Sequence, residues 1–248
     1  MKNLKKVFLP IVAVLLLLLS ACNTVNYILP ESFEDADQLL MPEEGELIAI
    51  FDTSFGEMRV RLFPGQAPKA VENFMKLAQR GYYNDITFHR ILVDFIVQSG
   101  DPTGTGSGGT SIWGKGFEDE FDTKLFHYRG ALSYARSSTA NDGEKNMSQF
   151  FFVTKNEKFY SVDVNKLLNR GYTEAAANAY LNARGDYTLD ALFNRYDSDD
   201  SFVVFGQLYE GWDVLDAIAA VEVDGNQKPL EDVKLNKITI TTYSANEQ

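Results

Sequence analysis

Hydrophobic residues form two β-like runs over residues 47–63, LIAIFDTSFGEMRVRLF, with a glycine near the middle. In the second half of this stretch, Met58, Val60 and Leu62 alternate with charged residues. Successive side chains of a strand point to opposite faces, so this period of two predicts a strand that is buried on one face. The glycine predicts a turn, and the stretch therefore predicts two β-strands joined by a tight connection.

A period close to 3.6 replaces the alternation over residues 67–83, APKAVENFMKLAQRGYY. Four apolar residues recur at i, i+3, i+4 and i+7, and they are Val71, Phe74, Met75 and Ala78. This spacing, with a proline near the start and Gly81 near the end, predicts a helix with one apolar face. The stretch GWDVLDAIAAV, residues 211–221, predicts a second helix.

Short β-like runs make up most of the remaining pattern. They lie at residues 95–98, 130–135, 149–154, 202–208 and 237–243. Strands and helices do not alternate along the chain, which argues against a parallel α/β sheet. Many short strands with two helices predict a mainly β protein whose antiparallel sheet is closed or sandwich-like.

Residues 161–201 interrupt this rhythm of short strands. They contain the helix-forming stretch TEAAANAYLNARG, which ends at Gly185, and an acidic close at residues 197–200. Strand signals resume directly afterwards. We therefore predict a helical insertion in a loop of the β-domain.

The N-terminus has the organisation of an export signal. Lys2, Lys5 and Lys6 precede an apolar run over residues 7–19, and the sequence Leu-Ser-Ala-Cys then ends at Cys22. A charged start, a short apolar core and small residues at a cleavage site are typical of a signal peptide. The apolar run is shorter than the roughly 20 residues that a membrane-spanning helix needs.

The Leu-Ser-Ala-Cys ending resembles the lipobox of bacterial lipoproteins, which implies cleavage before Cys22 and a lipid on its sulfur. We expect a lipoprotein signal peptide over residues 1–21, a lipidated acidic tether over 22–46 and a folded domain over 47–248. The protein would then be lipid-anchored to the cell membrane, on its extracytoplasmic face. A plain secretory signal that happens to contain a cysteine is the alternative. No second cysteine exists, so no intramolecular disulfide can form.

Composition narrows the possible partners. The chain has 248 residues, 45% of them hydrophobic, and a formal net charge of −12. That length and hydrophobic content suit a folded domain with a sizeable core. A nucleic-acid binder normally carries a basic face, so we expect no nucleic-acid partner.

A glycine-rich loop, residues 104–109, has the spacing G-x-G-x-x-G of a dinucleotide-binding turn. That turn needs a helix to begin inside it, so that the helix N-terminus meets a pyrophosphate. The residues that follow, TSIWGKGFEDEF, show no helical period. We therefore interpret the glycines as a tight surface loop with left-handed backbone angles.

The segment FHRILVDFIVQSGDPTGTGSGGTSIWGKGFEDEF closely resembles the signature of cyclophilins, the peptidyl-prolyl cis-trans isomerases. The stretches APKAVENFMKLAQRGYYNDITFHR, GALSYA, SQFFFV, FVVFGQLYEGWDVLDAI and KITI are similar to further segments of that family, in the same order. The resemblance runs over residues 47–243, apart from the insertion. It implies a closed eight-stranded antiparallel β-barrel capped by two helices, with the active site on the outer face. It implies no metal or organic cofactor.

Isomerisation of an Xaa-Pro bond needs no nucleophile or general base, because no covalent bond breaks. It needs a slot for the proline ring and a donor that draws the lone pair onto the nitrogen. The resemblance implies a catalytic group of Arg90, Gln98 and Gln149. It implies that substrate is bound by Phe95, Ile96, Ala135, Arg136, Phe151, Phe159, Tyr160 and Phe202. His89 is expected to be structural with its ring turned away from the substrate, and His127 has no evident catalytic partner in the sequence.

Each of these residues also has an ordinary structural explanation. Phe95, Ile96 and Phe151 could belong to the core, Arg90 could form a surface ion pair, and Gln98 could be an outward-facing strand residue. The sequence also departs from the family pattern at three of the positions. They are Arg136 in place of an asparagine, Phe159 in place of a tryptophan and Phe202 in place of a histidine.

Three functions fit these observations. The first is a monomeric, membrane-anchored prolyl isomerase that acts on Xaa-Pro segments of exported polypeptides. The second is a module that binds proline-containing segments without useful catalysis, which the three departures and the insertion would suit. The third is a solute-binding lipoprotein, which would need two α/β lobes that the predominantly β pattern does not favour.

Overall fold

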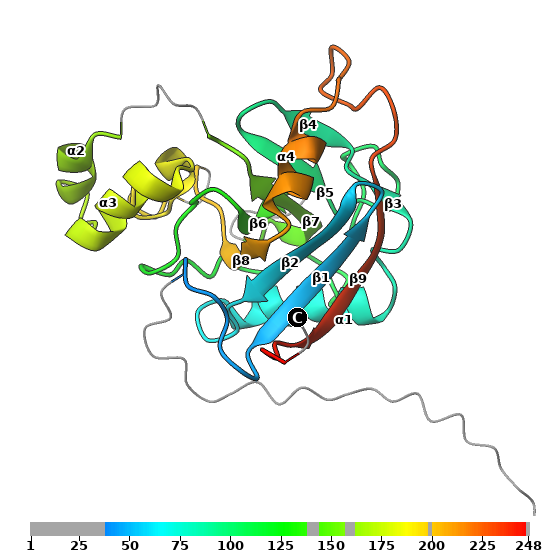
Figure 1. Cartoon of the computed structure of the whole chain (residues 1–248), viewed down its shortest axis with the longest axis horizontal. Helices are drawn as coiled ribbons and strands as arrows, with labels where there is room; N and C mark the ends of the chain where they lie inside the picture. The colour runs from blue at the N-terminus through cyan, green and yellow to red at the C-terminus, as the bar shows by residue number, and fades with distance from the viewer. Residues whose placement is uncertain (1–37, 138–143, 157–161, 198–199, 247–248) are drawn as a thin grey trace, which may run out of the picture.

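The computed structural model describes residues 38–137, 144–156, 162–197 and 200–246 (Figure 1). The strands are β1 (Leu47–Thr53), β2 (Gly56–Leu62), β3 (Ile86–Thr87), β4 (Arg90–Leu92), β5 (Ile96–Ser99), β6 (Ala131–Arg136), β7 (Asn146–Val153), β8 (Val204–Glu210) and β9 (Lys234–Thr242). The helices are α1 (Pro68–Gln79), α2 (Val164–Leu168), α3 (Glu174–Ala183) and α4 (Trp212–Ala219), with a 3-10 helix η1 (Tyr187–Leu189).

The strands form one antiparallel sheet in the order β3-β9-β1-β2-β8-β6-β7-β5-β4. Its two end strands, β3 and β4, are consecutive in the chain and are separated only by Phe88 and His89. The sheet therefore curls round until its two edges are joined through these two residues. The predicted mainly β, antiparallel fold is confirmed.

The described residues form nine strands where the resemblance implies eight, because residues 86–92 form two short strands. β3 pairs with β9, whereas β4 pairs with β5. Between them, the backbone N–H of Phe88 still donates to the carbonyl of Val233 at 2.9 Å. The chain changes partner at His89, so the ladder is interrupted where the curled sheet meets itself.

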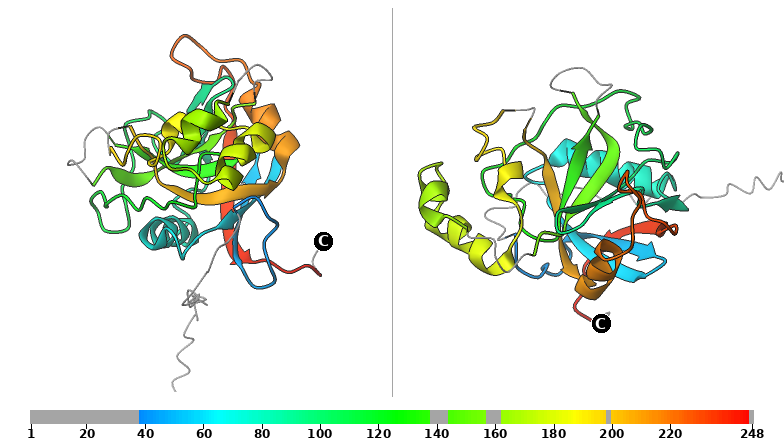
Figure 2. Two further views of the ribbon diagram at one scale, coloured as in Figure 1. Left: turned by 90° about the vertical axis from the view of Figure 1, so that its left-hand side faces the viewer. Right: turned by 90° about the horizontal axis from the view of Figure 1, so that it is seen from above.

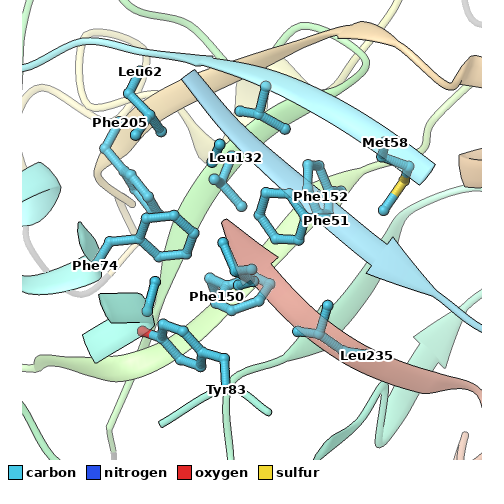
Figure 3. Packing of buried hydrophobic residues seen from close by; sticks show 14 of the residues in the cluster. Phe51, Met58, Leu62, Phe74, Tyr83, Leu132, Phe150, Phe152, Phe205 and Leu235 are labelled. Atoms are coloured by element: carbon cyan, nitrogen blue, oxygen red, sulfur yellow. The ribbon is translucent and has the colours of Figure 1, made fainter. Parts of the chain in front are cut away.

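The interior of the sheet is filled by aromatic rings (Figure 3). Phe51 packs edge-on against Phe152 with ring centroids 5.2 Å apart, and Phe74 of α1 lies 5.2 Å from Phe205. The four residues predicted to form the apolar face of α1 are all buried. The two predicted helices, α1 and α4, lie on opposite sides of the sheet in Figure 1 and pack against its strands.

The insertion forms a small helical unit beside the sheet (Figure 2). Thr173 caps the N-terminus of α3, because its side-chain oxygen accepts a hydrogen bond from the backbone N–H of Ala176. The helix stops before Gly185, which has a positive φ of 115°. The unit shares a hydrophobic cluster with the segment before β6, made of Phe126, Tyr128, Val162, Leu167, Tyr172, Ala177, Tyr180 and Tyr187. The predicted helix is confirmed.

The stretch before β1 is part of the folded domain from the first residue that the structure describes. Gln38 is 3% exposed, and its side-chain amide donates to the carbonyl of Phe126 at 2.7 Å and accepts from the N–H of Phe126 at 2.8 Å. Glu46 forms a buried ion pair with Arg61 at 2.7 Å. The last third of the expected tether therefore packs on the domain, which extends at least to Gln38. The expected signal peptide and Cys22 lie outside the described residues.

None of the helices in the described part of the chain is long and apolar enough to cross a membrane.

Candidate functional site

A chain of polar side chains crosses the outer face of β4, β5 and β7. Arg90 and Gln98 are directly opposite each other in the β4–β5 pair. The Arg90 Nη1 donates to Gln98 Oε1 at 3.3 Å, and Gln98 Nε2 donates to Gln149 Oε1 at 2.8 Å. Arg90 Nε donates to Gln227 Oε1 at 3.0 Å. Two glutamine oxygens therefore hold the guanidinium from two sides. Because the group is planar, these two bonds also fix the directions of its other N–H groups.

Arg90 shares a cavity of about 300 Å³ with a group of apolar side chains. The lining residues are Arg90, Phe95, Ile96, Gln98, Ala135, Arg136, Phe151, Leu189 and Phe202. The ring of Phe202 meets that of Phe151 edge-on, with centroids 5.4 Å apart. Eight residues predicted from the sequence thus surround one cavity, together with a ninth, Leu189, that the sequence did not indicate.

The strand period explains why these side chains meet. Val97, Phe150 and Phe152 are fully buried in the core inside the sheet. Their neighbours Ile96 and Phe151 point to the opposite face and form a second apolar cluster, which Phe95 and Phe202 cover in part. These residues are therefore not part of the main core. The outer face carries its own apolar cluster beside the polar chain.

Arg136 lines the cavity, but its charge is paired with an acidic residue. Its Nη1 lies 2.9 Å from Asp119 Oδ1, and only 9% of its side chain is exposed. The same nitrogen donates to the carbonyl of Ser201 at 3.1 Å. Asn146 also donates to Asp119, at 2.8 Å. Arg136 thus ties β6 to the residue that precedes Phe202, and this bond helps to fix the aromatic wall.

A second, smaller cavity of about 70 Å³ adjoins the first. It shares Gln98, Ala135 and Arg136 with the larger one and is otherwise lined by Gly106, Ser107, Gly108, Ser137, Met147 and Gln149. Gln149 Nε2 donates to the carbonyls of Gly106 and Gly108, at 3.0 and 2.7 Å. The polar chain that begins at Arg90 therefore ends on the glycine-rich loop.

The glycine-rich loop is wrapped around a carboxylate of the chain itself. Asp101 Oδ2 accepts from the N–H groups of Gly106 at 2.7 Å and Gly108 at 3.0 Å, and Asp101 Oδ1 accepts from Thr103 at 2.8 Å. Burial alone would raise the pKa of Asp101, but these hydrogen bonds outweigh it and hold the pKa below its usual value. Gly104, Gly106 and Gly109 have positive φ angles, as predicted. Because Asp101 occupies these donors, the loop has another use than holding a phosphate.

The two histidines of the chain are both buried. His89 is 6% exposed and is not among the residues that line the cavity. Burial, the largest influence, and the nearby charge of Arg90 lower the pKa of His89, which favours the neutral ring. His127 has a partner that the sequence did not reveal, because its Nδ1 lies 2.8 Å from Asp190 Oδ1.

Two of the predicted residues, Phe159 and Tyr160, lie outside the described residues. Sequence reasoning missed Leu189 and Gln227. Leu189 belongs to η1 in the insertion, and its carbonyl accepts from the N–H of Phe202 at 3.2 Å. Gln227 lies in the loop between α4 and β9, 137 positions after Arg90. Neither residue has a local pattern that points to the site.

In the part of the chain that the structure describes, no group of three or more His, Cys, Asp or Glu side chains is placed to hold a metal ion.

Similarity to known proteins identifies the family to which this chain belongs. The family model described as "Cyclophilin type peptidyl-prolyl cis-trans isomerase/CLD" matches residues 48–240. A Staphylococcus saprophyticus protein named "Putative peptidyl-prolyl cis-trans isomerase" is 43% identical over 195 residues, which is 79% of this chain and 92% of that protein. A Staphylococcus haemolyticus protein of the same name is 42% identical over 198 residues, covering 80% and 93% of the two chains.

A solved structure shows the same fold. A Cryptosporidium parvum cyclophilin type peptidyl-prolyl cis-trans isomerase, crystallised in the presence of the dipeptide Ala-Pro, superimposes with a TM-score of 0.60 and 29% identity. The match covers 79% of this chain and 99% of that one. The chain belongs to the cyclophilin-type peptidyl-prolyl cis-trans isomerase family. Its enzyme class, predicted from the sequence, is confirmed.

Proposed function

We propose that this isomerase acts on Xaa-Pro segments of exported polypeptides, at the outer face of a membrane to which a lipid on Cys22 anchors it. The pattern of Met1–Cys22 supports the export and the anchor. Residues 23–37 separate Cys22 from the described domain and would span at most about 50 Å when fully extended. A domain attached to the membrane through this segment would meet polypeptides that emerge on the same side of the membrane.

Arg90 is the proposed donor in the reaction. The amide barrier of about 18–20 kcal/mol arises because the nitrogen shares its lone pair with the carbonyl. A guanidinium that donates to this nitrogen favours the pyramidal, twisted amide over the planar one. The guanidinium of Arg90 offers a planar fork of N–H donors, and Gln98 and Gln227 hold it at the rim of the cavity.

The apolar residues would bind the proline ring. Five large apolar side chains line the cavity, and they are those of Phe95, Ile96, Phe151, Leu189 and Phe202. Burial of the ring in this cavity would fix one side of the Xaa-Pro bond, so that the carbonyl side could rotate. The rate gain would come from tighter binding of the twisted amide than of either planar isomer.

One observation carries this mechanism: the guanidinium of Arg90 and the rings of Phe95, Phe151 and Phe202 line the same cavity. A test compares cis-trans exchange of an Xaa-Pro peptide with the chain from residue 38 onward, as wild type and as Arg90→Ala. We expect the variant to lose about 100-fold in kcat/KM, the loss typical of one preorganised donor. Arg90→Lys should be intermediate, because it keeps the charge and loses the planar fork.

Arg59→Ala is the matched control, because Arg59 pairs with Glu57 on the strand β2, away from the cavity. It should keep wild-type exchange rates. An Arg90→Ala enzyme with full activity would contradict the proposed mechanism. Binding of the peptide without any acceleration of exchange would instead favour a module that only binds proline segments.

The anchor is tested in a bacterial host with the full chain and Cys22→Ser. The wild type should incorporate an alkyne-labelled fatty acid and sediment with membranes. The variant should lose the label and leave the membrane fraction. Normal processing and secretion of wild-type chain without label would show a plain secretory signal instead.

A further inference from the structure

A buried carboxylate, Asp190, joins the insertion to the strand-bearing domain. It is 1% exposed and accepts from several donors. Its Oδ1 accepts from the backbone N–H of His127 at 2.8 Å and faces the Nδ1 of the same residue at 2.8 Å. Its Oδ2 accepts from the hydroxyl groups of Tyr172 and Tyr180, each at 2.6 Å. A buried carboxylate is tolerated only when its oxygens are satisfied in this way.

The two tyrosines remain donors at all relevant pH values. Burial is the main reason why the pKa values of Tyr172 and Tyr180 lie well above the ordinary tyrosine value, and the negative charge of Asp190 adds to the effect. Both tyrosines belong to the insertion, whereas His127 precedes β6. Asp190 is therefore a clamp that connects the two parts of the molecule.

The clamp lies directly beside the proposed proline cavity. Leu189, the residue before Asp190, lines that cavity. On the other side of the clamp, the His127 ring stacks on Phe151 with centroids 6.2 Å apart and an interplanar angle of 16°. It also meets Phe202 edge-on at 6.3 Å. The groups that hold Asp190 are thus in contact with two further walls of the same cavity.

We propose that Asp190 is a positioning residue for isomerisation, which holds Leu189 of the insertion in place as one wall of the proline cavity. The inference rests on the proposed function of that cavity and gives the insertion a role in it. Without the clamp, the hydrogen bond from the N–H of Phe202 still ties the Leu189 carbonyl to the segment just before β8. Small displacements of a binding wall are costly, because the reacting group must be held within about 0.5 Å.

Tyr172→Phe tests the clamp with minimal disturbance, since it removes one donor to Asp190 and keeps the ring. Tyr128→Phe is the matched control. Tyr128 lies in the same hydrophobic cluster, and its hydroxyl donates to the carbonyl of Ala176 at 3.1 Å instead of to Asp190. We expect Tyr172→Phe to lower kcat/KM about three- to tenfold, mainly through a higher KM, and Tyr128→Phe to stay within about twofold of wild type.

The change in KM separates positioning from a general loss of structure. A variant that merely unfolds in part lowers the concentration of active enzyme, which lowers the apparent kcat and leaves KM unchanged. Urea unfolding of both variants shows whether their stabilities are comparable. Equal effects of Tyr172→Phe and Tyr128→Phe on KM would overturn the inference.

A double-mutant cycle with Leu189→Ala tests whether the clamp acts through Leu189. If it does, Tyr172→Phe should have little further effect in the Leu189→Ala background. An undiminished effect in that background would overturn the inference.

Binding measurements keep this result separate from the proposed function. The Kd of an Ala-Pro peptide is measured for the same variants by NMR titration. A wild-type chain without any exchange activity would refute the proposed function. A Kd that rises for Tyr172→Phe and not for Tyr128→Phe would still support the clamp, whereas equal Kd values would contradict it.

Discussion

Gln98 connects Arg90, the proposed donor, to Gln149 and so to the glycine-rich loop. Its side chain can be replaced without leaving a cavity in the core. We predict that Gln98→Leu lowers kcat/KM about tenfold, because Arg90 Nη1 loses its acceptor on one side and Gln149 loses a donor. The free energy of unfolding should change by less than about 1 kcal/mol, since the side chain is only partly buried. The exchange assay and urea unfolding measure the two effects.

Gln79→Leu controls for the loss of an amide, because Gln79 is exposed at the end of α1. It should leave kcat/KM unchanged. A Gln98→Leu enzyme as active as this control would show that Arg90 needs no support from β5.

His89 gives the stability of the protein a defined dependence on pH. Its pKa is lowered in the folded state, chiefly by burial. Between the ordinary histidine value of about 6.5 and the lower folded value, the unfolded chain binds more protons. Stability is therefore predicted to fall as the pH drops below about 6.5, and His89→Phe should flatten this dependence. Urea unfolding at pH 7.5 and 5.5 measures it, and identical slopes in the two proteins would rule out His89 as the cause.

At the scale of single elements, the contact between the insertion and the strands depends on one glycine. Gly185 has a φ of 115°, and a Cβ atom there would lie 2.2 Å from the carbonyl oxygen of His127. We predict that Gly185→Ala lowers the free energy of unfolding by about 2–4 kcal/mol, from backbone strain and the clash together. Because the clash disturbs the segment that carries Asp190, kcat/KM should fall as well.

Gly171→Ala separates strain from the clash. Gly171 also lies in the insertion with a positive φ of 95°, but the nearest atom to its Cβ position is a Leu192 side-chain carbon at 3.7 Å. This variant should cost only about 1–2 kcal/mol and keep its activity. Thermal unfolding and the exchange assay compare the two variants. Equal losses of stability would mean that the close approach of Gly185 to His127 is unimportant.

Elements with a complete local period could be predicted from the sequence, and those defined by a partner could not. The period of 3.6 in residues 71–78 and the alternation around Met58 can be seen in the sequence alone. The sequence therefore predicts α1 and β2 together with their buried faces. The division of residues 86–92 between β3 and β4 was not visible. It depends on two partners, β9 and β5, that lie far away in the sequence.

At the scale of the whole molecule, the site residues also fall into two groups: those that the sequence could predict and those that it could not. Arg90, Phe95 and Gln98 belong to one continuous motif, and Phe151 lies on the strand that pairs with it, so a family resemblance could assign them together. Leu189 and Gln227 reach the site only through the folded chain. The first comes from the insertion and the second from the loop before β9. A side chain brought in by tertiary contacts alone leaves no periodic signal in its own segment.

The segment before β1 shows the same limit. Its acidic, aperiodic sequence predicted a tether as far as residue 46, and the structure packs it on the domain from Gln38 onward. Gln38 satisfies both backbone groups of Phe126 at once, a match that only the folded chain presents.

A chain that begins at Leu47 should therefore be markedly less stable than one that begins at Gln38. It lacks Glu46, the carboxylate of a buried ion pair, and the amide that satisfies Phe126. Removal of one member of a buried ion pair typically costs about 3–5 kcal/mol, so we predict a loss of at least that size. Urea unfolding of the two chains measures the difference.

Single substitutions divide this loss between its causes. Glu46→Gln keeps the shape of the side chain and should cost about 1.5–3 kcal/mol, the usual contribution of a hydrogen bond to a charged group. Glu43→Gln is the control, because the side chain of Glu43 is exposed and its loss of charge should leave stability within about 0.5 kcal/mol. If the shorter chain proved as stable as the longer one, the contacts of residues 38–46 would be incidental and the domain would begin at β1.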